Sequence, residues 1–453
     1  MVSTQPLWNF MNTHFVFFKF QGGFFMENFE SQKDLPEVTV SSSHFAKTKG
    51  GRTSITPPAK ISKLPSKKLK ILCSGVDSLY LSLNVFWKDL SFFERLSQAK
   101  NIAASREKDI CFPVSLKNFP DPYKFNIKFY GTQGYEWLLY NGDYSLRIGN
   151  WPKPQSRPSI QIQFHSETLW LSGLKKSITF ILRLIRECGG KVSDVIISRL
   201  DLCIDTLFPR SLWTKKLIDL SVTRAKHAGL YFNNKELTGM TFGKGRIHAR
   251  FYDKPLEIQQ KSKKTWFYDQ VWKIDKAPDG YKIIRIELQL TRETIKELQI
   301  IKLGHLYRLL HNAWAYCTCN WLKFQNNPGK QSHQRKTYPW WKIVQKGFIT
   351  TTLVTDPLIR CKCSNPTKKS LFNLSFGSMS SLLAVEMETG KDLPSNEVSI
   401  YNAVHSYLDC IPEFGKTDPL FQEAVNNKRA KYQKLHQKYI EATEKRKKLG
   451  FIR

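Results

Sequence analysis

The sequence predicts an α+β fold in which helices cover one face of an antiparallel sheet. The opposite, polar face is expected to be open, and a basic helical tail is expected to follow. Two observations carry this prediction. Apolar and polar residues alternate with the two-residue period of a β-strand in stretches 196–206, 246–254 and 284–290. Strand-like and helical segments also follow one another in an order typical of α+β domains.

The three stretches separate an aliphatic side from a charged side. In the first, Leu200, Leu202 and Ile204 fall on the aliphatic side. The opposite sides of the three stretches comprise Arg199, Asp201, Cys203 and Asp205; His248, Arg250, Tyr252 and Lys254; and Arg285, Glu287 and Gln289. If the strands share a sheet with their apolar sides together, these polar residues meet on its other face.

The remaining chain divides into three parts. Residues 1–70 are predicted to be a disordered basic arm, because 41–70 is rich in Ser, Thr, Pro, Gly and Lys and offers little apolar area to bury. Residues 71–345 form the predicted folded domain. Residues 346–453 are an extension that ends in a basic helix from about 422.

Within the domain, periodicity and Gly or Pro punctuation predict the order of elements. A strand at 75–85 and a helix at 87–106 are followed by a meander of short strands over 123–170. Further helices are expected at 174–188, 212–228 and 291–312.

The charge balance favours a polyanionic partner. Lys and Arg number 70 against 38 Asp and Glu, a net charge of +32 spread along the chain. Neutralising nucleic-acid phosphates releases counterions, so we expect a nucleic acid as the partner. Nine cysteines without a small-domain spacing favour a reducing, cytoplasmic compartment over a disulfide framework. No stretch is long and apolar enough to predict a membrane span.

The predicted polar face holds residues suited to phosphodiester chemistry. Asp201 and Glu287, with Asp205, are candidate ligands for Mg²⁺ or Mn²⁺, which prefer hard oxygen donors. The alternative is that they form cross-strand ion pairs with neighbouring arginines. Tyr252 is a candidate nucleophile, with Lys254 beside it to balance charge; alternatively, Tyr252 is an aromatic strand residue that stacks on its neighbours.

Further residues are candidates for contact with DNA or a metal. The turn 242–246 brings Lys244 and Arg246 to a position where backbone can approach phosphate, although it also fits a plain hairpin. The expected DNA-binding residues are Arg199, Lys244, Arg246, His248, Arg250 and Arg285. Two Cys-X-Cys pairs, 317–319 and 361–363, match a zinc site or reduced cysteines.

Several segments resemble the replication initiation factor family of rolling-circle plasmids and filamentous phages, to which conjugative-element relaxases are related. They are Ser-Arg-Leu-Asp-Leu-Cys-Ile-Asp at 198–205, Thr-Phe-Gly-Lys at 241–244, Arg-Phe-Tyr-Asp-Lys-Pro-Leu-Glu at 250–257 and Arg-Ile-Glu-Leu at 285–288. Gly-Val-Asp at 75–77 and Pro-Trp-Trp at 339–341 also sit where the family has them. The resemblance spans roughly residues 72–345.

The resemblance implies an initiator that nicks one strand of an origin with a tyrosine and a divalent ion. Its implied partners are double-stranded origin DNA and single-stranded DNA. Asp201 and Glu287 match the family's acidic positions. One plasmid branch places the nucleophile just before the hairpin glycine, where this chain reads Met-Thr-Phe-Gly at 240–243 without a tyrosine. The nucleophile is therefore Tyr252 or Tyr231, or the protein binds origins without cutting them.

Three functions follow from these expectations. The first is a rolling-circle initiator, a DNA-nicking endonuclease that works with a host helicase and polymerase and whose assembly as a dimer is left open. The second is a non-catalytic regulator that binds an origin or operator through the same scaffold. The third is a conjugative relaxase with the same chemistry at a transfer origin.

Overall fold

The computed structural model describes residues 37–40, 68–117, 119–326, 331, 334–348, 356–361, 366, 368–388, 401–404 and 418–451. The predicted basic arm therefore lies outside the described residues, apart from the strand β1 (Glu37–Val40) and residues 68–70. Cys363, one of the four candidate zinc ligands, also lies outside them.

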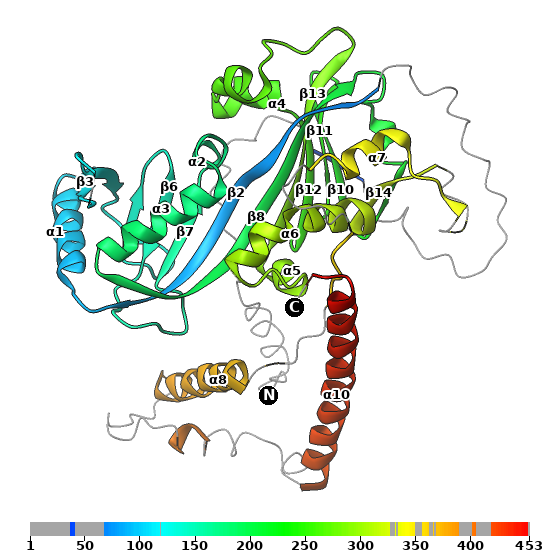
Figure 1. Cartoon of the computed structure of the whole chain (residues 1–453). Coiled ribbons are helices and arrows are strands. Elements are labelled where there is room, and N and C mark those ends of the chain that lie inside the picture. Colours follow the sequence, from blue (N-terminus) through cyan, green and yellow to red (C-terminus); the bar gives the residue numbers. More distant parts are fainter. Residues whose placement is uncertain are drawn as a thin grey trace, which may run out of the picture.

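Twelve of the strands in the described residues form one large antiparallel sheet, confirming the predicted fold class. The strand order is β1-β10-β11-β12-β13-β8-β2-β7-β6-β5-β4-β3, and every neighbouring pair is antiparallel (Figure 1). At its centre, β2 (Lys70–Trp87) pairs with β8 (Gly190–Pro209) along most of their length. These two long strands join the two halves of the sheet.

One half of the sheet contains the meander predicted over 123–170, together with β3, a strand that was not predicted. Its strands are β3 (Ile110–Val114), β4 (Tyr123–Ile127), β5 (Trp137–Tyr140), β6 (Tyr144–Ile148) and β7 (Ile160–Phe164). Alternate residues of each strand are buried against α1 (Ser91–Ser105) and α3 (Leu174–Glu187), which confirms two predicted helices. The apolar period of two in the strands thus meets the apolar stripes of the helices.

The other half contains the second and third alternating stretches. Its strands are β10 (Ala228–Asn233), β11 (Glu236–Phe242), β12 (Ile247–Asp253) and β13 (Tyr281–Thr291). Its apolar face packs against α5 (Arg292–Glu297), α6 (Leu303–Tyr316), the π-helical turn η7 (Cys317–Trp321) and α7 (Pro339–Gln345). In Figure 1, α3, α5, α6 and α7 lie in front of the sheet. Both halves therefore bury the same face.

The polar face is covered at one end. The short helix α2 (Ser166–Leu171) lies there. So does a later segment that contains α4 (Lys254–Glu257) and the π-helical turns η5 (Ile258–Ser262) and η6 (Phe267–Trp272). Phe267 and Trp272 form a second apolar cluster with Leu207, Ile258 and Ile283. The expected open face is thus open over only part of its area.

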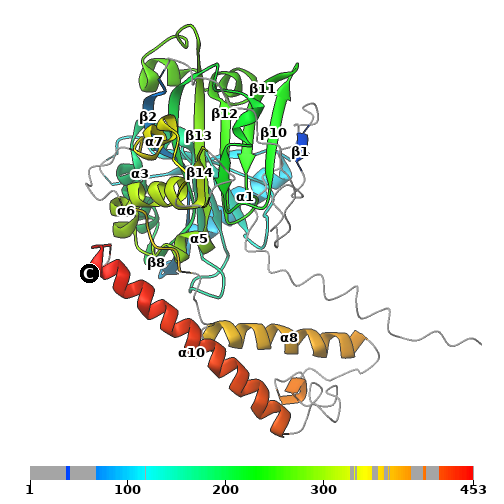
Figure 2. The same ribbon diagram turned by 90° about the vertical axis from the view of Figure 1, so that its right-hand side faces the viewer.

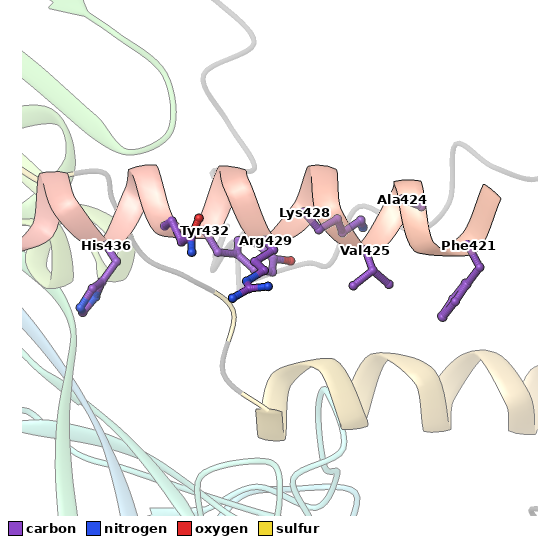
Figure 3. A pocket seen from close by; sticks show the side chains of 8 residues that line it. Phe421, Ala424, Val425, Lys428, Arg429, Tyr432 and His436 are labelled. Atoms are coloured by element: carbon purple, nitrogen blue, oxygen red, sulfur yellow. The ribbon is translucent and has the colours of Figure 1, made fainter. Parts of the chain in front are cut away.

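Two helices of the C-terminal extension project from this body. They are α8 (Lys368–Glu388) and the predicted basic helix, α10 (Asp418–Lys448) (Figure 2). The C-terminal end of α10 is fixed to the body, because buried Arg446 donates to the carbonyls of Glu297 and Ile359. Its N-terminal half presents Phe421, Val425 and Tyr432 along a pocket on the helix surface (Figure 3).

Two helix predictions differ from the structure. The helix predicted over 212–228 is wrong: one 3₁₀ turn η4 (Lys215–Leu217) precedes strand β9 (Ser221–Thr223), which pairs with β14 (Leu322–Phe324) in a separate two-stranded sheet. Val222 and Thr223 are β-branched and suit a strand. The helix predicted over 291–312 is interrupted, because Gln299 takes a left-handed conformation (φ 63°) after α5.

None of the helices in the described ranges combines the length and hydrophobicity that crossing a membrane requires.

Candidate functional site

The strand register brings the predicted polar residues onto one face. Across β13 and β8, Arg285 pairs with Asp205 and Glu287 pairs with Cys203. Across β12 and β13, Arg250 pairs with Glu287 and Tyr252 pairs with Arg285. The alternation in the sequence therefore predicted the shared face correctly.

Two arginines and two carboxylates form the centre of the site. Arg199 forms a bidentate ion pair with Asp201, with Nε–Oδ1 and Nη2–Oδ2 distances of 2.9 and 2.5 Å. The Nη2 atom of Arg250 lies 2.5 Å from Oε1 of Glu287 and 3.3 Å from Oδ2 of Asp201. The carboxylates are almost fully buried, whereas the Arg199 and Arg250 side chains are 23% and 27% exposed. The solvent-facing side of this cluster is therefore cationic.

The burial of Asp201 alters its proton affinity. Burial raises the pKa of Asp201 to about 6, opposed by the positive charge and hydrogen bonds of Arg199. Burial, and next the nearby charge of Arg250, lower the pKa of His248 to about 4. His248 is thus neutral at physiological pH and supplies no charge to DNA.

Tyr252 lies beside the cluster and is bonded to it. Its hydroxyl donates to Oε2 of Glu287 at 2.9 Å. Burial, with the negative charge of Glu287, raises the pKa of Tyr252 well above its ordinary value. The Nζ atom of Lys254 lies 5.8 Å from the centre of the Tyr252 ring and 2.5 Å from Oε2 of Glu257. The phenol is therefore protonated at rest, with a carboxylate placed to accept its proton.

A fully buried ion pair supports the site from its covered end. Arg285 donates from Nε and Nη2 to Asp205 at 2.6 and 2.8 Å. Trp272 donates from Nε1 to the same carboxylate at 2.7 Å. Through Nη1, Arg285 also contacts Asp77 at 2.6 Å. The segment that covers this end is thus joined to the sheet by polar bonds as well as apolar packing.

Sequence reasoning missed three residues of the site: Asp77, Trp272, and Trp170, whose Nε1 donates to Asp77 at 3.3 Å. Asp77 occupies a bulge in β2, because Val76 pairs with Leu202 and Ser78 pairs with Asp201. A bulge changes the direction in which a side chain points, and no local sequence signal marks the bulge here. Burial alone would raise the pKa of Asp77, but the charges of Arg285, Lys254 and Lys264 hold it at about 2.

The other predicted residues lie away from the centre. Tyr231, on β10, faces the same side as Tyr252, but Gly239 of β11 separates them. Lys244 and Arg246 lie in the turn between β11 and β12, where Arg246 pairs with Glu297 at 2.8 Å. The structure therefore brings Tyr252, but not Tyr231, into contact with the acidic residues.

The three candidate metal ligands do not fit a divalent ion in this arrangement. Every carboxylate oxygen of Asp201, Asp205 and Glu287 accepts a bond from a guanidinium, indole, thiol or phenol group. The guanidinium of Arg250 bridges Asp201 and Glu287, and its charge would repel a cation there. The described part of the chain contains no cluster of three or more His, Cys, Asp or Glu residues arranged for a metal.

The chain was compared with protein families, curated proteins and solved structures. No protein-family profile and no curated protein matches the chain. A rolling circle replication initiator protein from Geobacillus stearothermophilus is similar over 63% of this chain and 100% of its own, with 20% identity and a TM-score of 0.35. At this TM-score the similarity carries no argument about function, which has to come from the site.

Proposed function

We propose that this chain is a DNA-binding initiator of replication that cuts one strand with Tyr252. The observation that carries the proposal is the hydrogen bond from the Tyr252 hydroxyl to Glu287 beside two partly exposed guanidinium groups. A nucleophile, a base and a phosphate-binding pair thus lie on adjoining strands. The net charge of +32 supports a nucleic acid as the partner.

The proposed reaction transfers a phosphoryl group to the tyrosine. Arg199 and Arg250 bind the phosphodiester and offset the charge that builds on its oxygens. The Tyr252 oxygen attacks phosphorus while its proton passes to Glu287, and the bond from phosphorus to the 3′ oxygen breaks. The released 3′ oxygen takes a proton from water, leaving a 3′-hydroxyl and a 5′-phosphotyrosine. No step of this scheme passes through a metal ion.

Arg199 and Arg250 can accommodate a DNA phosphate beside their carboxylate partners. The Nε atom of Arg250 is buried and has no hydrogen-bond partner among the described residues. Arg199 makes its contacts with Asp201 through Nε and Nη2. Since an unpaired buried donor costs free energy, a phosphate oxygen at Arg250 would be favourable.

A second candidate function is a DNA-binding regulator without cutting activity. The raised pKa of Tyr252, caused mainly by burial, favours this candidate because it makes the nucleophile harder to form. The same arginines would then serve binding alone.

A covalent adduct distinguishes the two functions. Purified protein would be incubated with labelled single-stranded and supercoiled DNA of its own replicon, with Mn²⁺ or with EDTA, and run on a denaturing gel. We expect an adduct that is absent in Tyr252→Phe and present in Tyr231→Phe, the matched control two strands away. An adduct that persists in Tyr252→Phe contradicts the proposed nucleophile. Tight binding without any adduct favours the regulator. An adduct that forms only with Mn²⁺ would contradict the metal-free scheme.

A further inference from the structure

The polar face continues beyond the candidate site across the other half of the sheet. From Arg199 on β8, the strand register leads to Tyr80 on β2 and Gln163 on β7. It continues through Ser145 on β6 and Tyr140 on β5. We call the two adjacent rows on this face the polar track; its residues are Tyr80, Gln163, Ser145, Tyr140, Asn126, Ser82, Gln161, Arg147, Leu138 and Lys128.

The two faces of this half of the sheet differ in burial. The alternate residues, such as Leu139, Leu146 and Ile162, are at most 2% exposed beneath α1 and α3. Eight of the ten track residues are half-buried, Asn126 is exposed and Ser82 is buried. This is the pattern of a sheet that has a helical layer on one side and a ligand-accessible surface on the other.

The composition of the track suits single-stranded nucleic acid. The Nζ atom of Lys128 lies 5.2 Å from the Tyr140 ring and 5.1 Å from the ring of Tyr130, which is 45% exposed. At the other end, Arg199 lies 5.0 Å from the Tyr80 ring. Aromatic rings stack on bases while neighbouring cations neutralise phosphates, and this combination binds single strands with little sequence preference.

One amide in the track is unsatisfied. The side-chain oxygen of Gln161 is buried and accepts no hydrogen bond from the described residues. A buried acceptor without a donor costs free energy, and an amino group on a base would supply that donor. This observation is independent of charge and points to a ligand with polar edges.

We propose that the polar track binds the single strand that is led to Tyr252. This inference deepens the proposed function and rests on it. Five strand spacings separate β8 from β4 in the sheet order, which is about 24 Å. At the ~3.4 Å spacing of one strand in B-DNA, this distance corresponds to about seven nucleotides. The track ends at Arg199, so a bound strand would reach the arginine cluster directly.

Charge removal on the two faces tests the proposal. The probe is a fluorescein-labelled oligothymidylate of about twelve nucleotides, with binding followed by anisotropy over a range of salt concentrations in the Tyr252→Phe background. For Lys128→Ala/Arg147→Ala we expect affinity to fall about tenfold or more. The negative slope of log K against log salt should become shallower by about 1.4, since each phosphate contact on a single strand contributes about 0.7 to its magnitude.

The control variant removes the same two positive charges from the helical layer on the opposite face of the sheet. Lys175 and Lys176 are exposed on α3, and Lys175→Ala/Lys176→Ala should leave the salt slope near that of the parent. A second comparison separates stacking from charge: Tyr140→Ala should weaken binding, while Tyr140→Phe, which loses only the hydroxyl bond to Asp109, should not.

The outcomes separate this inference from the nicking proposal. If Lys128→Ala/Arg147→Ala and Tyr140→Ala both bind like the α3 control, the proposed binding of single-stranded DNA to the polar track is wrong. This holds even if the parent protein forms a covalent adduct. If the track variants lose affinity but the protein never forms an adduct, the track stands and the nicking proposal fails.

Discussion

Arg285 and Asp205 form a two-pronged ion pair in which both side chains are completely buried, with nitrogen–oxygen distances of 2.6 and 2.8 Å. The pair lies between the central strands and the covering segment, since Asp205 also accepts from Trp272 and Arg285 also contacts Asp77. Removing one partner of such a pair leaves a buried charge without compensation.

Arg285→Leu is therefore expected to lower the free energy of unfolding by about 3–5 kcal/mol, measured by urea denaturation. Arg246→Leu is the control, because the Arg246 side chain is 57% exposed and its pair with Glu297 should contribute no more than about 1 kcal/mol. Equal losses in the two variants would contradict the structural role of the buried pair.

His248 is expected to make stability depend on pH. Burial and the charge of Arg250 lower its pKa from 6.5 to about 4, so the unfolded chain binds the proton more readily between these values. The contribution of His248 to stability is thus full above about pH 6.5 and lost as the pH falls towards 4. At about 1.4 kcal/mol per tenfold change in proton affinity, the loss reaches at most ~3 kcal/mol.

The contribution of His248 is isolated by comparison with His248→Gln. The stability of the wild type minus that of the variant should decrease as the pH is lowered from 6.5 to 4 in denaturant titrations. The contribution of Asp201 cancels in this difference, because it is present in both proteins. Its raised pKa changes stability in the opposite sense, increasing it as the pH falls. A difference that stays constant over this range would show that His248 titrates normally.

Gly75 allows α2 to approach the sheet. A Cβ at this position would lie 2.8 Å from Cη2 of Trp170, closer than packed atoms permit. Gly75→Ala should therefore cost about 1–3 kcal/mol by overpacking, seen as a lower urea midpoint. Gly142→Ala is the matched control, because nothing lies within 4 Å of its added Cβ. A neutral Gly75→Ala would mean that α2 is not held against β2.

Glu287→Gln tests the proposed base. The amide keeps the size of the side chain but accepts a proton poorly, so adduct formation should slow by about 10²–10⁴ while DNA binding persists. Glu297→Gln changes a carboxylate that pairs with Arg246 and Arg360 instead of Tyr252, and should leave the rate unchanged. Equal rates for Glu287→Gln and the wild type would remove Glu287 from the reaction.

The sequence predicted the shared polar face but not its internal pairing. Alternation placed Asp201, Glu287 and Arg250 on one side, because a strand has a strict two-residue period. Which arginine binds which carboxylate depends on the register between strands, which the alternation within one strand does not specify. The cross-strand ion pairs considered as an alternative to metal binding are observed between Arg250 and Glu287 and between Arg285 and Asp205. Asp201 instead pairs mainly with Arg199 of its own strand.

Other features depend on contacts between distant segments. The bulge at Asp77 and the packing of Trp272 on Asp205 join residues far apart in the chain. The covering segment after Lys254 contains two π-helical turns, for which the sequence provides no period to detect. Helices such as α3 were predictable because an apolar stripe and a terminal Gly-Gly mark them locally.

The most direct measurement of the central claim is the identity of the residue that carries DNA after reaction. Protein incubated with a single strand of its own replicon would be digested with nuclease and protease, and the nucleotide-bearing peptide sequenced by tandem mass spectrometry. The account predicts a phosphotyrosine-linked nucleotide on Tyr252. A nucleotide on Tyr231 or on any other residue would contradict it.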